Sequence, residues 1–187
     1  MEGIANDRTR RLPAGVHGIP RELVERNQRE RLIAAMAEVC AKRGYAFATV
    51  ADVARQAGVS TASFYRQFAD KQECMLASFE ELFGRLLEEV ERAYEREAEP
   101  MAKAKAAVGA AAELLAADLP TARLLTVEVV AAGAEGAQAQ YVAIERLGGL
   151  FQAEWATVAG MVALVARRVL KGDAPIASEL EEACDLG

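Results

Sequence analysis

The sequence has little of what most catalytic sites need. It contains one histidine, His17, which lies in an N-terminal stretch without helical periodicity. It shows no nucleophile motif, no glycine-rich phosphate loop and no pair of carboxylates in an apolar setting. We therefore predict that the chain is not an enzyme and uses no cofactor.

Cysteine is also scarce, with three residues far apart in the chain: Cys40, Cys74 and Cys184. An odd number at wide spacing, without a nearby histidine cluster, does not form a disulfide framework or a zinc site. We predict buried or inert thiols and no metal.

Long apolar segments are missing as well. No apolar run reaches the roughly 18 residues that cross a bilayer, and the first residues carry Asp7, Arg8, Arg10 and Arg11 without the apolar segment of a secretory signal. These absences predict a cytoplasmic protein with no membrane partner.

Runs of strand-forming Val, Ile and Tyr are missing too, whereas alanine is abundant and apolar residues recur at helical intervals along nearly the whole chain. This pattern predicts an all-α fold with about nine helices.

Charge is distributed unevenly. The net charge is −6 overall, but residues 1–75 hold 12 Lys and Arg against 9 Asp and Glu, which leaves 10 against 19 for residues 76–187. The net charges of the two parts are therefore +3 and −9. This asymmetry favours an anionic partner for the N-terminal part and an acidic body behind it.

The stretch from Thr49 to Lys71 has the spacing of a helix-turn-helix. Thr49 and Asp52 form a carboxylate variant of the capping box, and Gly58 suits the left-handed end of the first helix. Ser60 can cap the second helix, whose Phe64 and Phe68 point to the core. Its outer face presents Thr61, Ala62, Ser63, Tyr65, Arg66 and Gln67. Small residues and hydroxyls there suit a DNA major groove; the alternative is a helical hairpin with a polar surface.

Helices are expected on both sides of this motif. A helix over 21–43 begins after Pro20 and ends at Gly44, and Phe47 in the link that follows is expected to pack under the motif. A long helix over 71–97 begins after the cap Asp70 and joins the motif to the body. Lys71 lies at its N-terminus, where backbone N–H groups and the helix dipole favour a phosphate.

The body is predicted to contain helices over 101–117, 120–132, 138–155, 156–171 and 175–186. The first of these is rich in small residues, which allow close helix packing or leave room for a ligand. Glu128 is the one charge in an apolar helix. It either forms a buried salt bridge or hydrogen bond, or anchors a ligand. The two helices predicted on either side of Trp155 follow each other without turn residues. Either they form one long bent helix, or residues of a connecting loop are absent from the sequence.

From about Arg29 to Leu82 the sequence resembles the TetR family of bacterial transcriptional regulators. The resemblance rests on the helix closed by Gly44, on TVADVARQAGVS at 49–60, on FYRQF at 64–68 and on the helix that follows Lys71. It implies a homodimer in which helices 138–155 and 156–171 pack against their mates. It also implies phosphate contacts from Thr49, Ser63, Tyr65 and Lys71 and base contacts from Thr61, Ala62 and Arg66. Ser60 completes the predicted DNA-contacting set.

These observations together suggest a dimeric repressor that an apolar ligand releases from a palindromic operator in double-stranded DNA. The alternative is a DNA-binding regulator with no small-molecule effector, or one gated by a protein partner. We expect a flexible basic arm over 1–19, a helix-turn-helix domain over 20–75 and an effector-binding and dimerisation domain over 76–187. The arm is either a disordered terminus or a basic tail that reaches the DNA. The predicted ligand walls are Phe79, Phe83, Leu86, Leu115, Leu124, Val127, Glu128, Tyr141 and Phe151.

Overall fold

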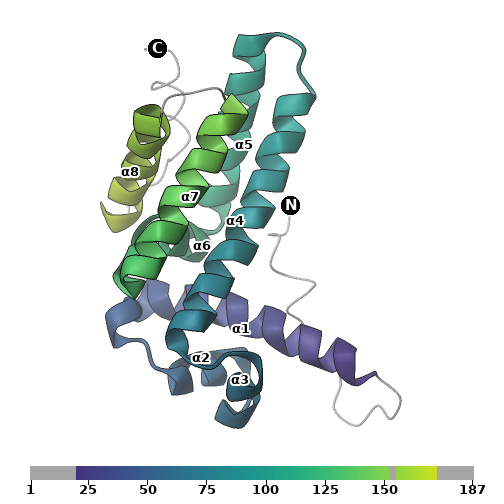
Figure 1. Ribbon diagram of the computed structural model, residues 1–187, viewed down its shortest axis with the longest axis vertical. Helices are drawn as coiled ribbons and strands as arrows, with labels where there is room; N and C mark the ends of the chain where they lie inside the picture. Colours follow the sequence, from purple (N-terminus) through teal and green to yellow (C-terminus); the bar gives the residue numbers. More distant parts are fainter. Residues whose placement is uncertain (1–19, 152–154, 172–187) are drawn as a thin grey trace.

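The structure is a computed structural model that describes residues 20–151 and 155–171, and within these ranges it is built from helices without any strand (Figure 1). The all-α prediction is confirmed for this part of the chain, which holds eight α-helices. The expected arm over 1–19 and the helix expected over 175–186 lie outside the described residues, and so do the side chains of 151 and 155–159.

Three helices form the N-terminal end of the molecule: α1 (Arg21–Arg43), α2 (Val50–Ala57) and α3 (Thr61–Gln67). Gly44 ends α1 with φ +77°, a backbone conformation that suits glycine. Phe64 of α3 and Phe68, which directly follows it, are buried as predicted and belong to the same core as Leu32 and Met36 of α1.

A short 3₁₀ turn, η1 (Tyr45–Phe47), joins α1 to α2. The prediction that Phe47 packs beneath the motif is wrong, because its side chain is 77% exposed. Tyr45 is the buried aromatic residue of this turn. The turn contains both aromatic residues two positions apart, and periodicity alone did not decide which of them faces inward.

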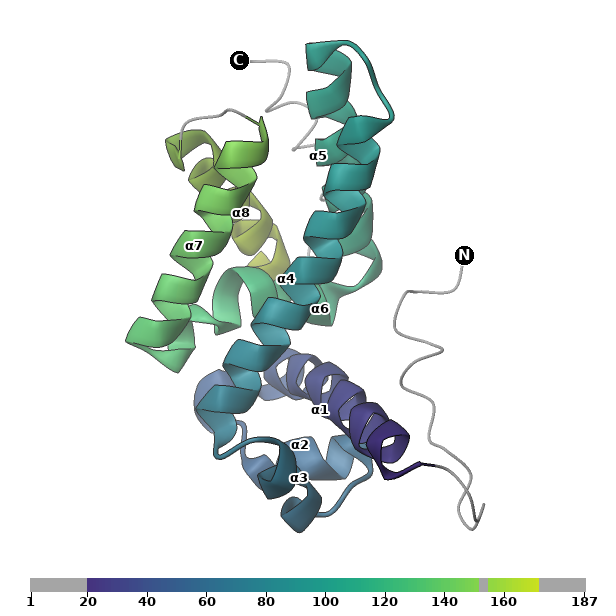
Figure 2. The ribbon, with the colours of Figure 1, turned by 45° about the vertical axis from the view of Figure 1, so that its right-hand side comes forward.

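The long helix α4 (Lys71–Glu95) joins this end to the rest of the molecule. Its first turns pack on α1, and further along it packs against α5 (Pro100–Ala117) and α7 (Ala134–Phe151). Figure 2 shows α4 running from the cluster of α1, α2 and α3 up into the body. The N-terminal helices and the body therefore share one continuous element.

The middle of the body departs from the predicted single helix over 120–132. The chain there forms α6 (Leu119–Arg123), a π-helical turn η2 (Leu124–Glu128) and a 3₁₀ turn η3 (Val130–Ala132). Gly133 follows with φ +93°, and α7 begins at Ala134, four residues before the predicted start.

The last described helix is α8 (Trp155–Lys171), which packs against α7, α6 and η2. Because α7 and α8 are separate helices that lie side by side, the single bent helix considered from the sequence is not observed. In the described part of the chain, no helix combines the length and apolarity needed to cross a membrane.

Candidate functional site

Local hydrogen bonds fix the position of α3. Thr49 and Asp52 form the predicted capping box of α2: Thr49 Oγ1 accepts from the Asp52 N–H (3.1 Å), and Asp52 Oδ2 accepts from the Thr49 N–H (3.3 Å). Gly58 ends α2 in the left-handed region, with φ +63°. Ser60 Oγ accepts from the Ser63 N–H at 3.0 Å and starts α3. These residues set the angle between the two helices.

The outer face of α3 is open to solvent. Thr61, Ala62, Tyr65 and Arg66 are exposed, and the Tyr65 side chain projects with 59% of its surface accessible. Ser63, also a predicted DNA contact, is 7% exposed. Its hydroxyl accepts from Arg66 Nη2 at 2.7 Å and lies 3.0 Å from Ser60 Oγ. In this structure Ser63 therefore holds the Arg66 side chain.

Two other predicted contacts serve the scaffold as well. Thr49 is exposed, and its hydroxyl donates to Asp52 Oδ2 at 2.7 Å. Lys71 Nζ donates to the carbonyl oxygens of Tyr45 (2.9 Å) and Ala48 (3.0 Å) and lies 4.2 Å from the centre of the Tyr45 ring. Lys71 thus fastens the start of α4 to the turn before α2.

The Asp52 carboxylate accepts hydrogen bonds from three side chains of this region, those of Arg43, Thr49 and Arg55. The hydrogen bond from the Thr49 hydroxyl lowers the pKa of Asp52 to about 2, with further contributions from Arg55 and Arg43. Asp52 Oδ2 accepts from Arg43 at 2.7 Å and Oδ1 accepts from Arg55 at 2.8 Å. The carboxylate therefore ties the end of α1 to the start of α2.

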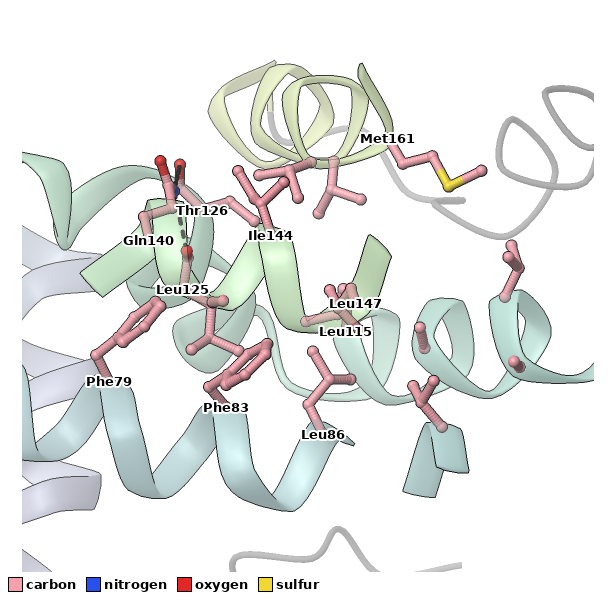
Figure 3. Close-up of a pocket in the computed structure, with 17 residues that line it drawn as sticks. Phe79, Phe83, Leu86, Leu115, Leu125, Thr126, Gln140, Ile144, Leu147 and Met161 are labelled. Carbon is pink, nitrogen blue, oxygen red and sulfur yellow. Dashed lines mark hydrogen bonds between the residues drawn. The ribbon is translucent and has the colours of Figure 1, made fainter. Parts of the chain in front are cut away.

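The body contains an apolar, partly open cavity of about 100 Å³ between α4, α5, η2, α7 and α8 (Figure 3). Thr126 and Gln140 are the polar side chains among its walls. Thr126 Oγ1 donates to the Ala122 carbonyl oxygen at 2.7 Å, and Gln140 Nε2 donates to the carbonyl oxygens of Leu125 and Thr126, both at 3.2 Å. Because these bonds are internal, the cavity presents a surface made almost entirely of carbon.

The predicted ligand walls divide into two groups. Phe79, Phe83 and Leu86 of α4 and Leu115 of α5 line the cavity. The other described members do not line it: Leu124 is fully buried, Val127 is partly buried, Glu128 is 4% exposed, and Tyr141 is 44% exposed on α7. The Phe151 side chain lies outside the described residues. In the π-helical turn η2 the backbone hydrogen bonds join residues five apart, whereas those of an α-helix join residues four apart. The side chains are therefore turned relative to an α-helix, and Leu125 and Thr126 face the cavity instead of Leu124 and Val127.

Glu128 connects the body to the N-terminal helices. It is 4% exposed, and its Oε1 accepts from Arg123 Nε at 2.8 Å. Its Oε2 accepts from the Tyr45 backbone N–H at 2.6 Å. Of the two interpretations left open by the sequence, the structure shows the salt bridge and the buried hydrogen bond. The η2 turn is thus bonded to the η1 turn.

Several walls were absent from the predicted set. They come from α4, α5, η2, α7 and α8: Val90, Ala107, Val108, Ala111, Leu125, Thr126, Gln140, Ala143, Ile144, Leu147, Met161, Val162 and Val165. The alanines of α5 were the available signal, since a helix poor in bulk leaves space beside it. The apolar periodicity did not indicate which side chains of η2 face the cavity.

The N-terminal part of the chain matches a known protein family. A family model described as bacterial regulatory proteins, tetR family, matches residues 32–78. The fatty acid metabolism regulator protein of Bacillus subtilis (strain 168) is 31% identical over 88 residues, which are 47% of this chain and 45% of that protein. The chain therefore matches less than half the length of this relative.

Solved structures share the fold over most of the chain. The fatty acid degradation regulator FadR from Bacillus halodurans has a TM-score of 0.74 at 19% identity, covering 85% of this chain and 93% of that one. FadR from Bacillus subtilis, solved in complex with stearoyl-CoA, has a TM-score of 0.72 at 21% identity, covering 83% and 95%.

The matched family model and these named relatives describe regulators and not enzymes, which agrees with the prediction from the sequence. The match spans the second half of α1, the helix-turn-helix and the first turns of α4. Over residues 32–78, the chain is therefore similar to the bacterial regulatory proteins of the tetR family.

Proposed function

We propose that this chain is a dimeric DNA-binding transcriptional regulator, a repressor that a long-chain acyl ligand such as an acyl-CoA releases from a palindromic operator. The DNA-binding part is residues 20–75, and residues 76–187 form the effector-binding and dimerisation part. The observation that carries the proposal is the carbon-lined cavity beside α4, the helix that also begins at the helix-turn-helix.

The DNA side of the proposal rests on the exposed face of α3. Thr61, Ala62 and Arg66 would contact base edges, whereas Thr49, Ser63, Tyr65 and Lys71 would contact phosphates. Ser60 completes the proposed DNA-contacting set. In a two-fold dimer the two α3 helices would read major grooves about 34–36 Å apart. A pseudo-palindromic site follows from that symmetry.

The ligand side rests on the chemistry of the cavity. A saturated alkyl chain needs no hydrogen-bond partner, and each buried methylene contributes about 0.8 kcal/mol. Arg146 is exposed on α7 with its guanidinium 5.4 Å from the ring centre of Phe83, a cavity wall. A cation at that edge suits the anionic headgroup of an acyl-CoA. The relative crystallised with stearoyl-CoA, and the relative named for fatty acid metabolism, support the same ligand class.

The size of the cavity suggests how the ligand acts. About 100 Å³ equals the liquid volume of roughly three water molecules, at about 30 Å³ each. A long acyl chain therefore requires the walls to move. Phe79 and Phe83 would carry α4 with them, and Leu125 would carry η2 with Glu128, the acceptor of the Tyr45 N–H. Both displacements reach the helix-turn-helix.

The test is selection of bound fragments from random genomic DNA by the full chain, with stearoyl-CoA, with CoA alone and with neither. We expect an enriched palindrome that stearoyl-CoA releases and CoA does not. No enriched palindrome would overturn the regulator. An enriched site that no acyl-CoA or metabolite extract affects would replace the ligand-gated version by an ungated or protein-gated one.

A pair of variants on α5 sharpens this test. Ala111 lines the cavity, whereas Ala116 is exposed on the same helix. We expect Ala111→Leu to bind the operator like the unmodified chain but to need at least roughly tenfold more stearoyl-CoA for release, because the added side chain occupies ligand space. Ala116→Leu should respond normally. Equal responses of both variants would place the acyl chain elsewhere.

A further inference from the structure

A basic groove lies beside the recognition helix, between the first turns of α1 and the C-terminal end of α3. Its walls are Arg21, Glu25, Arg26, Arg29, Arg66 and Gln67. Four guanidinium groups face one carboxylate, so the lining carries a net charge of +3. The one carboxylate is occupied, since Glu25 Oε1 accepts from Arg21 Nε at 2.7 Å.

The two walls are bonded to each other. Gln67 Nε2 donates to the Glu25 carbonyl oxygen at 3.3 Å, and Arg29 Nη1 donates to the Gln67 carbonyl oxygen at 3.4 Å. The Arg29 guanidinium also lies 4.6 Å from the ring centre of the buried Phe68. These contacts hold α1 and the end of α3 in a fixed relation, so the groove exists before any partner binds.

The groove opens on the side of the molecule that carries the reading face. Arg66 belongs to both, because it lines the groove and lies one helical turn after Ala62 on the exposed face of α3. Arg21, Arg26 and Arg29 are exposed on α1 next to it. A duplex that lies along α3 would therefore continue over these arginines.

We propose that this groove binds backbone phosphates of the DNA beside the half-site read by α3. Guanidinium groups present paired N–H donors that match phosphate oxygens, and they stay charged at all relevant pH values. Phosphate contacts position a protein without reading sequence, so the groove adds affinity and orientation for every DNA site. This inference rests on the proposed function and extends the DNA-contacting surface from α3 to α1.

The experiment measures operator affinity of the full chain as a function of salt concentration for the double variant Arg21→Gln, Arg26→Gln. Both side chains are exposed, and the hydrogen bond of Arg21 goes to Glu25 within the same helix. Each lost phosphate contact reduces the slope of log affinity against log salt by about 0.9. Because the dimer would carry two grooves, one or two lost contacts in each would make the slope smaller by about 2–4. We also expect an affinity lower by roughly threefold or more, with equal loss on operator and unrelated DNA.

Two comparisons isolate the groove. The variant Arg92→Gln, Arg96→Gln removes the same charge from exposed positions near the other end of α4 and should leave the slope within error. Arg21→Lys, Arg26→Lys keeps the charge and should retain the slope. Operators with single methylphosphonate substitutions then locate the contacts. The double glutamine variant should lose sensitivity only at the flanking phosphates that the groove binds.

The outcomes are separable. If the unmodified chain binds no operator, the proposed function fails. If it binds and the double glutamine variant has the same slope, affinity and methylphosphonate pattern, DNA does not enter the groove and this inference is overturned. A loss confined to the operator, with unrelated DNA unaffected, would also overturn it, because phosphates carry no sequence information.

Discussion

At the scale of residues, Asp52 and Glu128 each join segments that are distant in the chain. Asp52 holds Arg43 at the end of α1 as well as the cap of α2. Glu128 holds Arg123 and the Tyr45 N–H. The environments of the two carboxylates differ: Asp52 forms its contacts near the surface, whereas Glu128 is almost completely buried. The two carboxylates therefore give predictions of different kinds.

Asp52 gives a prediction for the stability of the fold at acidic pH. Its pKa in the folded chain is about 2, below the usual value near 3.9, so its ionised form stabilises the fold. That contribution is fully present above about pH 4 and is lost as the pH falls toward about 2. We expect Asp52→Asn to be less stable than the unmodified chain at pH 7, with the difference shrinking between pH 4 and pH 2.

Urea unfolding at pH 7, 4 and 3 measures this difference. Glu113→Gln, at an exposed position of α5, removes one negative charge without a comparable network and serves as the control. A stability difference between Asp52→Asn and the unmodified chain that is constant from pH 7 to pH 3 would contradict the prediction.

Glu128 gives a prediction for ligand response. Glutamine at this position keeps an oxygen for the Tyr45 N–H but removes the charge opposite Arg123. We expect Glu128→Gln to bind the operator while its coupling to stearoyl-CoA falls by about 0.5–2 kcal/mol, a roughly 2–30-fold change in the ratio of operator affinities without and with ligand.

Operator titrations at several stearoyl-CoA concentrations give that ratio, and Glu113→Gln again provides the reference. An unchanged ratio, together with lower resistance to urea, would show that Glu128 supports the fold without transmitting the ligand signal.

At the scale of elements, the sequence predicted the ends of helices better than their interiors. Caps are local chemistry, so Thr49 with Asp52, Gly58, Ser60 and Asp70 all stand where the residue types required. The π turn at Leu124–Glu128 was not predictable from periodicity, because it depends on the helices packed around it. The early start of α7 depends in the same way on its contact with η3.

That contact gives a prediction for α7. A Cβ at Gly136 would overlap the Val129 carbonyl oxygen, which is backbone and has no flexible end to move aside. We expect Gly136→Ala to destabilise the chain by about 1–3 kcal/mol. A Cβ at Gly149, in the same helix, would meet no atom within 4 Å, and Gly149→Ala should be neutral or stabilising by up to about 1 kcal/mol.

Urea midpoints of the two variants provide the comparison. The shared helix cancels the effect of alanine on helix propensity, so the difference between the variants reports the steric contact. Equal midpoints would mean that the backbone at Val129 moves away from α7 at little cost.

At the scale of the whole molecule, α7 and α8 leave apolar side chains on their outer faces. Tyr141 and Val142 of α7 are 44% and 43% exposed, and Leu170 of α8 is 59% exposed. Tyr141 was predicted to line the ligand site from its apolar spacing, and its position outside the cavity fits the proposed dimer surface instead. Periodicity identifies an apolar face but does not say whether a ligand or a second chain covers it.

A charge in this face should prevent dimerisation. We expect the unmodified chain to sediment as a dimer at micromolar concentration and Val142→Glu to sediment as a monomer, because a buried unpaired carboxylate is costly. Met101→Glu, at a residue 56% exposed at the start of α5, should remain dimeric. A Val142→Glu dimer as tight as that of the unmodified chain would move the proposed interface to another face.

The connection through Tyr45 has a consequence for protein engineering. The Tyr45 backbone is held from the body by Glu128, through its N–H, and from α4 by Lys71, through its carbonyl oxygen. A chimera that grafts this helix-turn-helix onto another ligand-binding body must therefore recreate an acceptor opposite the Tyr45 N–H as well as a continuous α4. Chimeras in which the two parts are joined only within α4 would bind DNA, but their DNA affinity would change little when the new body binds its ligand.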